Sequence, residues 1–570
     1  MEKYLWLYIV IGVIILIILI YSIATSKRRK KARLLAKIRA AYGVLPKREY
    51  TDEEFRKIRS FYELLKAEGG YRVDDITWND LDMDSVFIAM NHTFSSPGEE
   101  VLYDLLREPS FDEEELRERE RVTQYFIDNA AAREAFQIRF ASIGRTRKFS
   151  LAEFVGQFKS LELKDDLHYL LRTFILIIAI ASIFFNVVIG ILVLIGVMIF
   201  NIYKYYKEKG DVEPYYISLS AIASLIDAAD QIGSQTLKEL DPVKEYIEDL
   251  RENCKPVKSL KRDMKWLGSG TIAGAGGDIM QVVLDYLRMI THLDFLKFNR
   301  MVRKVQNCEE NILGLYWTMG LLEAMIAIGS YRQTIPFFCT AEFCGNEKKL
   351  AIKDEYHPLI KEPVANSFEE ERSLLLTGSN ASGKSTFLRT TALAVLMAQT
   401  VNTVHAHSYK GGFFRIYSSM ALRDDIESAQ SYFIVEITSL KRIMDASGGK
   451  GAPVLAFVDE VLRGTNTVER IAASSEILRN LSQKNAMLVA ATHDIELTEL
   501  LEDCYSNYHF EEEIVDDEIR FNYILKKGRA TTRNAIKLLS VMGYGKDVVT
   551  AAELTAERFM KEGVWTHSQK

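Results

Sequence analysis

The chain has 570 residues, of which 48% are hydrophobic and 26% are charged. This balance is that of globular protein, and the length is enough for three or four domains. The formal net charge of −6 excludes a polycation, so any binding of nucleic acid would require a local basic patch. The five cysteines follow no common zinc-binding spacing, which indicates reduced thiols in a cytosolic compartment.

The first predicted element is an apolar helix near the N-terminus, from Tyr4 to Ser26. About 20 apolar residues suffice to span a bilayer. A basic cluster follows from Lys27 to Arg33, whereas a cleaved signal peptide carries its basic residues before the apolar core. Because positive charge stays on the cytoplasmic side, residues 1–33 are predicted to form an uncleaved transmembrane anchor with its basic flank in the cytoplasm.

A helical linker is predicted at residues 34–77. Thr51 and Glu54 have the spacing of a capping box, which marks the start of a helix. The residues around Phe61 have helical periodicity, so we expect its ring on the apolar face of an amphipathic helix. Residues 78–167 are also mostly helical and charged.

An uninterrupted apolar stretch lies farther along the chain, from Phe174 to Tyr203. It contains no charged residue and is too long for one upright transmembrane helix. The residues alone allow one tilted helix, or two helices that turn near Asn186 and Gly190 with basic ends at the interface. The two helices would cover residues 168–206, and the choice between one helix and two depends on what lies on either side of the stretch.

Residues 207–349 are again helical, and from 350 to 570 short apolar runs alternate with helical patterns, as in a nucleotide-binding α/β domain. Gly378, four further residues and Gly383-Lys384-Ser385 form a Walker A loop between an apolar strand and a helix. Loop amides hold phosphate oxygens, Lys384 is predicted to reach the β- and γ-phosphates, and Ser385 is predicted to bind Mg²⁺. The predicted ATP-binding residues are Gly378, Ser379, Asn380, Ala381, Ser382, Gly383, Lys384, Ser385 and Thr386.

Two later strands are predicted to bring catalytic side chains to this loop. The apolar run that begins at Val454 ends in Asp459, which is predicted to hold Mg²⁺ with Ser385, and Glu460, which is predicted to polarise the attacking water as general base. The other strand leads to His493, which is predicted to sense the γ-phosphate. The predicted catalytic residues are therefore Glu460, His493 and Lys384.

Several motifs in order resemble the ATPase domain of the MutS family of DNA mismatch-repair proteins. They are His357-Pro358, Asn380 inside the Walker A loop, a signature-like segment Asp424–Ile437, a Walker B and D-loop segment Asp459–Arg470, a histidine segment Ala491–Leu500 and a closing helix Gly528–Val549. The resemblance implies an ABC-type P-loop ATPase domain. A transporter of that class would carry LSGGQ before the Walker B strand, and this chain does not.

The same resemblance implies a homodimer in which two ATPase domains face each other. Ser431 of one subunit would then reach the γ-phosphate bound by the other, and ATP would switch the conformation of the dimer.

Upstream, residues 81–109 and 321–329 are similar to the start of the MutS core and to its returning lever helix. Residues 78–167 and 207–349 are then two parts of one all-α core that lies on one side of the membrane. The stretch 168–206 is therefore predicted to be a transmembrane helical hairpin, with a shallow re-entrant hairpin as the alternative. The chain is placed in the cytoplasmic membrane, with its ATPase domain, residues 350–570, in the cytoplasm.

Three functions follow from this organisation. The first is a membrane-anchored ATPase whose nucleotide state is coupled to the membrane or to an unknown protein partner. The second is ATP-dependent binding of DNA near the membrane, for which a modest basic patch is available: Lys255, Lys258, Lys261, Arg262 and Lys265. The third is a scaffold that does not hydrolyse ATP.

Overall fold

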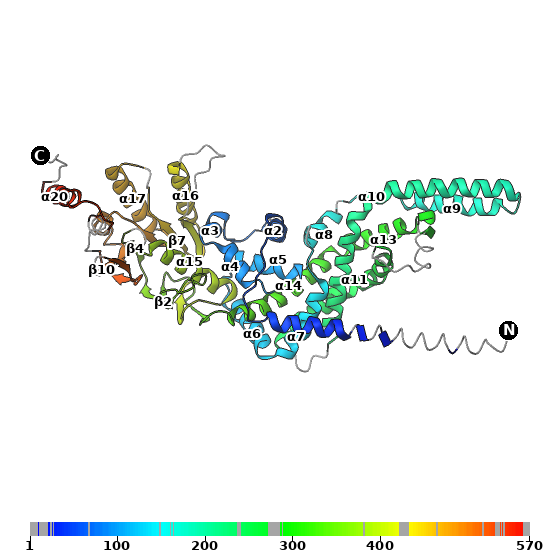
Figure 1. Cartoon of the computed structure of the whole chain (residues 1–570), viewed down its shortest axis with the longest axis horizontal. Coiled ribbons are helices and arrows are strands. Elements are labelled where there is room, and N and C mark those ends of the chain that lie inside the picture. The colour runs from blue at the N-terminus through cyan, green and yellow to red at the C-terminus, as the bar shows by residue number, and fades with distance from the viewer. Residues whose placement is uncertain are drawn as a thin grey trace. The chain divides into compact units, whose positions relative to one another are not determined.

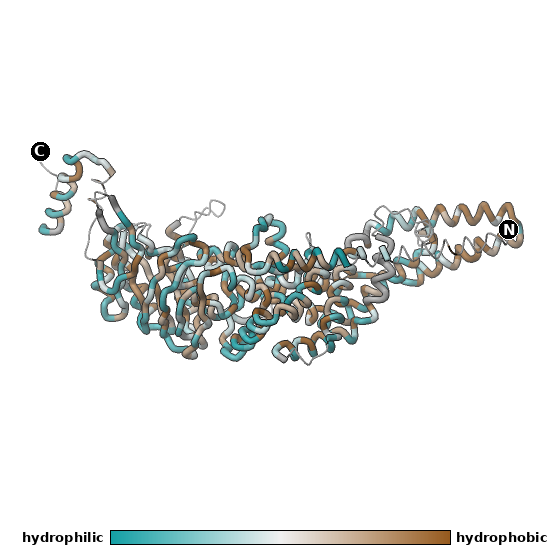
Figure 2. The backbone as a smooth tube through the Cα atoms, turned by 60° about the horizontal axis from the view of Figure 1, so that its bottom comes forward, coloured by the Kyte–Doolittle hydropathy of each residue, from teal (hydrophilic) through white to brown (hydrophobic). Residues whose placement is uncertain are grey.

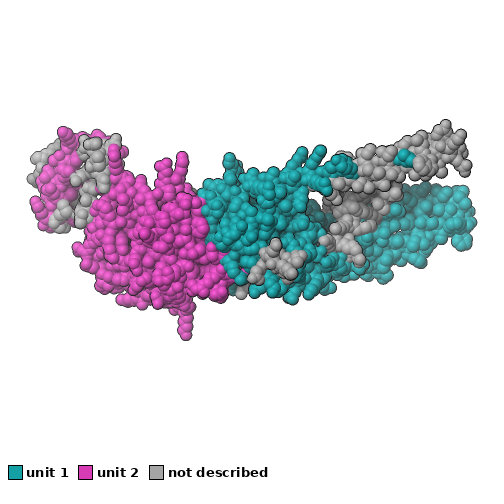
Figure 3. Space-filling view, turned by 90° about the horizontal axis from the view of Figure 1, so that it is seen from below, with its two compact units in different colours: residues 1–69, 89–104, 121–334 teal, residues 70–88, 105–120, 335–570 magenta. Residues whose placement is uncertain are grey.

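The computed structural model describes most of the chain as two compact units (Figure 3). The first unit comprises residues 1–69, 89–104 and 121–334, and the second comprises residues 70–88, 105–120 and 335–570. The described residues are 10, 21–22, 25–26, 28–66, 69–146, 150–159, 161–163, 165–235, 241–271, 286–287, 289–379, 382–420, 432–462, 465–515, 518–530, 536, 539 and 542–562.

The first unit is helical throughout its described elements. These are α2 (Asp52–Lys66), α7 (Ala130–Ile143), α8 (Leu151–Lys159), α9 (Asp166–Ser182), α10 (Val187–Gly233), η2 (Asp241–Val243), α11 (Lys244–Thr271), α13 (Leu293–Asn307) and α14 (Glu309–Arg332). Three helices have residues in both units: α4 (Met83–Met90), α5 (Ser96–Arg107) and α6 (Glu113–Asp128).

Helix α14 forms the core of the first unit, because every residue from Leu322 to Arg332 is buried or nearly so. Its Gly320 lies against α5, where a Cβ atom would stand 2.6 Å from the carbonyl oxygen of Pro97. Only glycine permits this close approach of the two helices.

Helix α2 confirms two local expectations. The hydroxyl of Thr51 accepts the backbone N–H of Glu54 at 3.3 Å, and the Glu54 carboxylate accepts the backbone N–H of Thr51 at 3.1 Å, which is a capping box. The Phe61 ring is only 2% exposed and packs against Tyr316 and Trp317. Phe61 is thus a core residue on the buried face of its helix.

Helices α9 and α10 form an antiparallel pair that turns at residues 183–186 (Figure 1). The Asn186 side chain accepts the backbone N–H groups of Val188 and Ile189 at 3.1 and 3.2 Å, so it caps the start of α10. A Cβ atom on Gly190 would lie 2.6 Å from the backbone nitrogen of Ile183, so the pair closes tightly beside the turn.

The second helix of this pair does not end near residue 206 as the sequence suggested. It continues to Gly233, because its later part changes from apolar on all sides to amphipathic. Leu219, Ile222, Ile226 and Ala229 have helical spacing, are at most 2% exposed and lie on the part of α10 that packs with α11. Because these residues pack against α11, the helix continues past the predicted end near residue 206.

Two of the described helices are long and apolar enough to cross a membrane, and their burial separates them. In α14, 78% of the apolar window is buried, as expected of a core helix. In Val187–Gly210 of α10 only 11% of the apolar window is buried, and the hydropathy colouring marks the part of the α9–α10 pair near its turn as apolar (Figure 2). The exposed apolar surface therefore belongs to the hairpin.

The second unit contains a six-stranded sheet in the order β12-β9-β4-β8-β7-β6, whose strands are parallel except for β12. Its strands are β4 (Ser373–Thr377), β6 (Arg415–Ser419), β7 (Val454–Asp459), β8 (Ala486–Ala491), β9 (Tyr505–His509) and β12 (Lys526–Lys527). A mixed sheet and a hairpin contain β1 (Ala341–Phe343), β2 (Leu350–Glu355), β3 (Asn366–Glu370), β5 (Ser408–Gly411), β10 (Glu512–Val515) and β11 (Glu518–Phe521).

Helices cover the six-stranded sheet. Helix α15 (Lys384–Val401) packs against β7 and β8, α16 (Tyr432–Ser447) against β6 and β7, and α17 (Thr467–Ser482) against β8. The remaining helices are α18 (Glu496–Leu500) and α20 (Lys546–Glu562). Strands β4, β7 and β8 are buried almost completely, which is usual for a parallel sheet covered by helices.

An unexpected feature is that an early segment completes the second unit. Helix α3 (Asp75–Asp80) lies against β6, where the Asp80 carboxylate accepts the Ser418 hydroxyl at 2.6 Å and the Met420 backbone N–H at 2.9 Å. The structure thus agrees with the predicted helical N-terminal part and α/β C-terminal part. The predicted domain boundaries stay a prediction.

Candidate functional site

The predicted phosphate-binding loop joins β4 to α15. Gly378 and Gly383 have φ values of +146° and +108°, which side chains rarely allow. At Gly378 a Cβ atom would also stand 2.8 Å from the carbonyl oxygen of Phe510. The Lys384 ammonium donates to the carbonyl oxygens of Gly378 and Ser379 at 2.8 and 2.9 Å, so it closes over its own loop.

Ser385 and Asp459 are adjacent, although 74 residues separate them in sequence. The Ser385 hydroxyl donates to Asp459 Oδ2 at 2.5 Å. The other carboxylate oxygen, Oδ1, is buried and has no hydrogen bond among the described residues. One hydroxyl oxygen and one carboxylate oxygen with spare capacity are the ligands that Mg²⁺ prefers.

Ser385 and Asp459 fit Mg²⁺ only if phosphate oxygens of the nucleotide bind the same ion. Within the described ranges, no group of three His, Cys, Asp or Glu side chains could hold a metal ion. Mg²⁺ usually keeps few protein ligands and completes its shell with water and substrate phosphate oxygens. Ser385 and Asp459 would hold such an ion, which would neutralise developing phosphate charge.

The three predicted catalytic residues converge beside this pair. His493 Nε2 lies 2.9 Å from Glu460 Oε1 and 3.5 Å from Lys384 Nζ. Strands β7 and β8 are neighbours in the sheet, and the backbone N–H of Glu460 donates to the carbonyl of Ala491 at 3.0 Å. The carboxyl ends of adjacent parallel strands therefore bring Glu460 and His493 together.

The turn that presents Glu460 is strained. Glu460 and Leu462 have φ values of +60° and +61°, in the left-handed region that glycine favours. Such non-glycine residues cost about 1–3 kcal/mol each and cluster at functional sites. The side chains of Val461 and Leu462 are only 3% exposed, so core packing helps to hold this turn.

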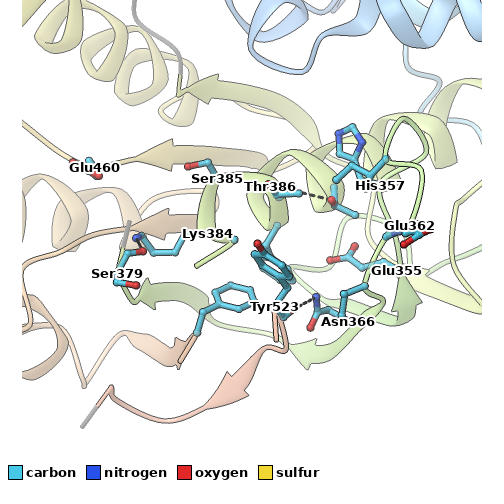
Figure 4. A pocket seen from close by; sticks show the side chains of 17 residues that line it. Glu355, His357, Glu362, Asn366, Ser379, Lys384, Ser385, Thr386, Glu460 and Tyr523 are labelled. Atoms are coloured by element: carbon cyan, nitrogen blue, oxygen red, sulfur yellow. Dashed lines mark hydrogen bonds between the residues drawn. The ribbon is translucent and has the colours of Figure 1, made fainter. Parts of the chain in front are cut away.

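A cavity of about 480 Å³ adjoins the loop (Figure 4). Ser379, Lys384, Ser385 and Glu460 lie toward one side of it, and Glu355, Glu362 and Asn366 lie toward the other. Its apolar lining comes from Ile360, Pro363, Val364, Phe387, Phe510 and Tyr523. Charged groups beside these apolar side chains suit a ligand with an anionic tail and an apolar ring.

Two titratable groups in the far wall are neutral near pH 7. Burial raises the pKa of Glu355 to about 8, and the Thr391 hydroxyl donates to its Oε1 at 2.7 Å. Burial lowers the pKa of His357 to about 4. The Glu355 carboxyl and the His357 imidazole therefore add no charge to this wall, which also contains Glu362.

Asn366 fastens the wall that carries Tyr523. Its side-chain amide donates to the Tyr523 carbonyl at 3.0 Å and accepts the backbone N–H of Leu525 at 2.7 Å. Tyr523 itself has a φ of +56°, and a Cβ atom on Gly383 would lie 3.1 Å from its ring. The Tyr523 ring is therefore held beside the start of α15.

Among the described residues, the structure brings together the predicted Gly378, Ser379, Ser382, Gly383, Lys384, Ser385 and Thr386 with Asp459, Glu460 and His493. Asn380, Ala381 and Ser431 lie outside the described residues. Sequence reasoning missed the roles of Glu355, Asn366 and Tyr523, because they come from separate strands and turns. Their only signal was the nearby His357-Pro358 pair.

The part of the sequence that forms this site is similar to known proteins. Residues 374–560 match the family model described as MutS domain V. A DNA mismatch repair protein MutS from Thermotoga maritima is 29% identical over 287 residues, which cover 48% of this chain and 35% of that protein. One from Aquifex pyrophilus is 33% identical over 216 residues, which cover 36% and 25%. The match thus spans about a third or less of these relatives.

Proposed function

We propose that this chain, which belongs to the MutS family, is a membrane-anchored ATPase that hydrolyses ATP with Mg²⁺ in an ABC-type P-loop domain. The observation that carries the proposal is the convergence of Lys384, Glu460 and His493 beside the Ser385–Asp459 pair. Lys384 lies at the start of α15, Glu460 directly follows β7 and His493 follows β8, so all three lie at the carboxyl ends of strands, where ligands of α/β proteins usually bind.

Each side chain has a distinct task in this proposal. Lys384 exchanges its bonds with the loop carbonyls for the β- and γ-phosphate oxygens. Glu460 accepts a proton from the attacking water and holds that water in line with the γ-phosphorus. His493, in contact with the Glu460 carboxylate, donates to the γ-phosphate and reports its presence. The part of the wall formed by the neutral Glu355 and His357 receives the base.

The test is Glu460→Gln in the full chain, purified in detergent. The amide keeps the size of the side chain but removes the base, so ATP should bind normally while hydrolysis falls by about 100-fold or more. Asp503→Asn, an exposed carboxylate paired with Arg479, is the matched control. Unchanged turnover in Glu460→Gln removes this residue as the base, and an inactive wild-type chain favours the scaffold.

A homodimer belongs to the same proposal. The family relationship supports two facing ATPase domains, with Ser431 of one subunit completing the site of the other. Because ATP would bridge the subunits, Glu460→Gln with ATP should form a stable dimer that ADP does not support. Light scattering in detergent measures this directly.

The α9–α10 pair supports attachment to the cytoplasmic membrane, with the ATPase domain in the cytoplasm. Phe184 and Phe185 at its turn are 89% and 92% exposed, and no charged residue lies between Arg172 and Lys204. The backbone N–H groups of both phenylalanines bond to carbonyls of α9, at 3.2 and 3.1 Å. A turn with satisfied backbone donors and apolar side chains suits hydrocarbon.

A spin label at Phe185→Cys tests this placement in the full chain reconstituted into liposomes. The label at position 185 should collide more often with oxygen than with a water-soluble nickel complex. A label at Leu500→Cys on α18 should show the reverse order. The unsubstituted protein gives the background from its five native cysteines. A water-like ratio at position 185 excludes insertion, and labelling from outside intact cells distinguishes full crossing from a re-entrant hairpin.

Binding of DNA is a second candidate, favoured by the two relatives, which are DNA mismatch repair proteins. Phe61 is not available to contact a DNA base, because its ring is 2% exposed and packs against Tyr316. We expect weak, salt-dependent DNA binding through Lys255 and Lys258 at most. Lack of binding by the full chain with ATP at low salt removes this candidate.

A further inference from the structure

Helix α16 begins immediately after Ser431 and contains a buried carboxylate, Glu436, that the proposed reaction does not use. The side chain is 2% exposed. Its Oε1 accepts the backbone N–H of Leu462 at 2.5 Å, across 26 residues of sequence. The first part of α16, which belongs to the signature-like segment, is therefore bonded to the turn after β7.

That turn has few other polar attachments among the described residues. The Glu460 backbone N–H donates to the Ala491 carbonyl, and the Ser474 hydroxyl donates to the Val461 carbonyl at 3.2 Å. Among these bonds, the one from Leu462 is the one that ends on a side-chain carboxyl group, which comes from a different helix. It acts on Leu462 itself, where φ is +61°.

The far part of α16 is fixed as well. Arg442, six residues beyond Glu436, pairs with Asp74 and donates to the carbonyl of Ser418. A shift of α16 would therefore act on both the turn and the α3–β6 contact.

We propose that Glu436 is a positioning residue that couples the signature segment to the general base. It holds Leu462 in its left-handed conformation, and this sets the direction in which Glu460 presents its carboxylate. Movement of α16 when Ser431 engages the partner's nucleotide would reach Glu460 through this bond. The inference rests on the proposed ATPase function and adds a physical route by which one site of the dimer regulates the other.

Three substitutions at this position separate positioning from charge and from folding. Glu436→Gln retains an oxygen acceptor for the Leu462 N–H, so kcat should stay within about 5-fold of the wild type. Glu436→Asp keeps the carboxyl group but withdraws its oxygen by one methylene, and Glu436→Ala removes it. Both should lower kcat by about 100-fold, the usual effect of a misplaced catalytic group, with the Kd for ATP within about 2-fold.

Asp445→Ala is the control, because Asp445 is an exposed residue of α16 that pairs with Lys441 and does not touch the turn. All variants are compared as full chains in detergent, with melting temperature and ATP affinity measured beside kcat. The inference is overturned if Glu436→Ala is as active as the wild type. It is also overturned if Glu436→Gln loses as much activity as Glu436→Ala. Parallel loss of ATP affinity shows a structural role instead. Failure of the proposed function is distinct, because it requires that the wild type itself does not hydrolyse ATP.

Discussion

Individual side chains determine what the cavity can accept. Lys384 contributes charge near the loop, whereas Glu355 and His357 in the opposite wall are neutral because burial shifts their pKa values in opposite directions. A buried carboxyl avoids the cost of an unpaired charge by keeping its proton. The protonation of Glu355 has a consequence for stability that can be measured.

Glu355→Gln should flatten part of the pH dependence of folding. The pKa of Glu355 is raised from 4.5 to about 8, so the folded chain keeps a proton that the unfolded chain has lost. The stability from this group is fully present below about pH 4.5 and is lost as the pH rises toward 8. The free energy of unfolding of the glutamine variant, minus that of the wild type, should therefore increase between pH 5 and pH 8. The increase should be on the order of a few kcal/mol.

Melting temperatures of the full chain between pH 5 and 8.5 check this expectation. Glu369→Gln, an exposed carboxylate on β3, provides the control and should follow the wild-type profile. The contributions of other titrating groups to the melting temperature cancel when the variant is compared with the wild type at each pH. Parallel profiles for wild type and Glu355→Gln would show that Glu355 is ionised in the folded chain.

Asp459→Asn should separate metal binding from nucleotide binding. The amide can still accept the Ser385 hydroxyl but supplies no negative charge to Mg²⁺. Hydrolysis should fall by about 100-fold or more, because the metal supplies several kcal/mol of charge stabilisation. Binding of ATP in EDTA, measured by calorimetry, should change little. Equal loss of binding in EDTA would indicate that Asp459 supports the loop rather than the metal.

At the scale of elements, the hairpin is joined to α13 by a buried polar cluster. Arg172 on α9 forms two hydrogen bonds with Glu208 on α10, at 2.9 and 3.1 Å, and the two side chains are 7% and 11% exposed. Arg172 also contacts His292, whose Nε2 lies 2.9 Å from the carbonyl oxygen of Asn201. These bonds fix the base of an otherwise apolar helix pair.

Removing one member of that ion pair should destabilise the first unit more than removing both. Arg172→Met leaves the Glu208 charge buried without this partner, which typically costs about 3–5 kcal/mol. Combining it with Glu208→Leu should restore part of the stability, because no buried charge then remains. Thermal unfolding of the three variants in detergent gives the coupling. Strictly additive losses would mean that the two side chains do not act as a pair.

The elements also show where prediction from sequence succeeds. The phosphate loop and the capping box of α2 could be predicted because their residues are close in sequence and each needs a fixed spacing. The extension of α10 to Gly233 and the contact of α3 with β6 could not, because packing partners far along the chain decide them. Glu436 escaped notice for the same reason, since a glutamate in a helix usually faces solvent.

For the whole molecule, the proposed function requires a second copy of the chain. The described residues supply the loop, the metal pair and the base from one subunit, while the signature residue Ser431 is predicted to come from the other. In a twofold dimer both sites have this composite form. Membrane attachment of both subunits would confine them to one plane and raise their effective concentration.

Mixing two inactive variants tests the composite site. Lys384→Ala disables the nucleotide loop of its own subunit, and Ser431→Arg disables the site that this subunit completes. Each homodimer loses both sites, but a mixed dimer keeps one intact site, in which Lys384 of the Ser431→Arg subunit faces Ser431 of the Lys384→Ala subunit. With random exchange half of the dimers are mixed, so about a quarter of wild-type hydrolysis should return.

The matched control mixes Lys384→Ala with Glu460→Gln, two variants that each disable the site in their own subunit. Every mixed dimer then contains two broken sites, so no activity should return. Recovery only in the first mixture requires that Ser431 acts across the interface. If Ser431 served its own subunit, the first mixture would also stay inactive, because each of its sites would contain one substitution. The pair of mixtures therefore determines whether the proposed site of ATP hydrolysis is complete in one chain or only in two.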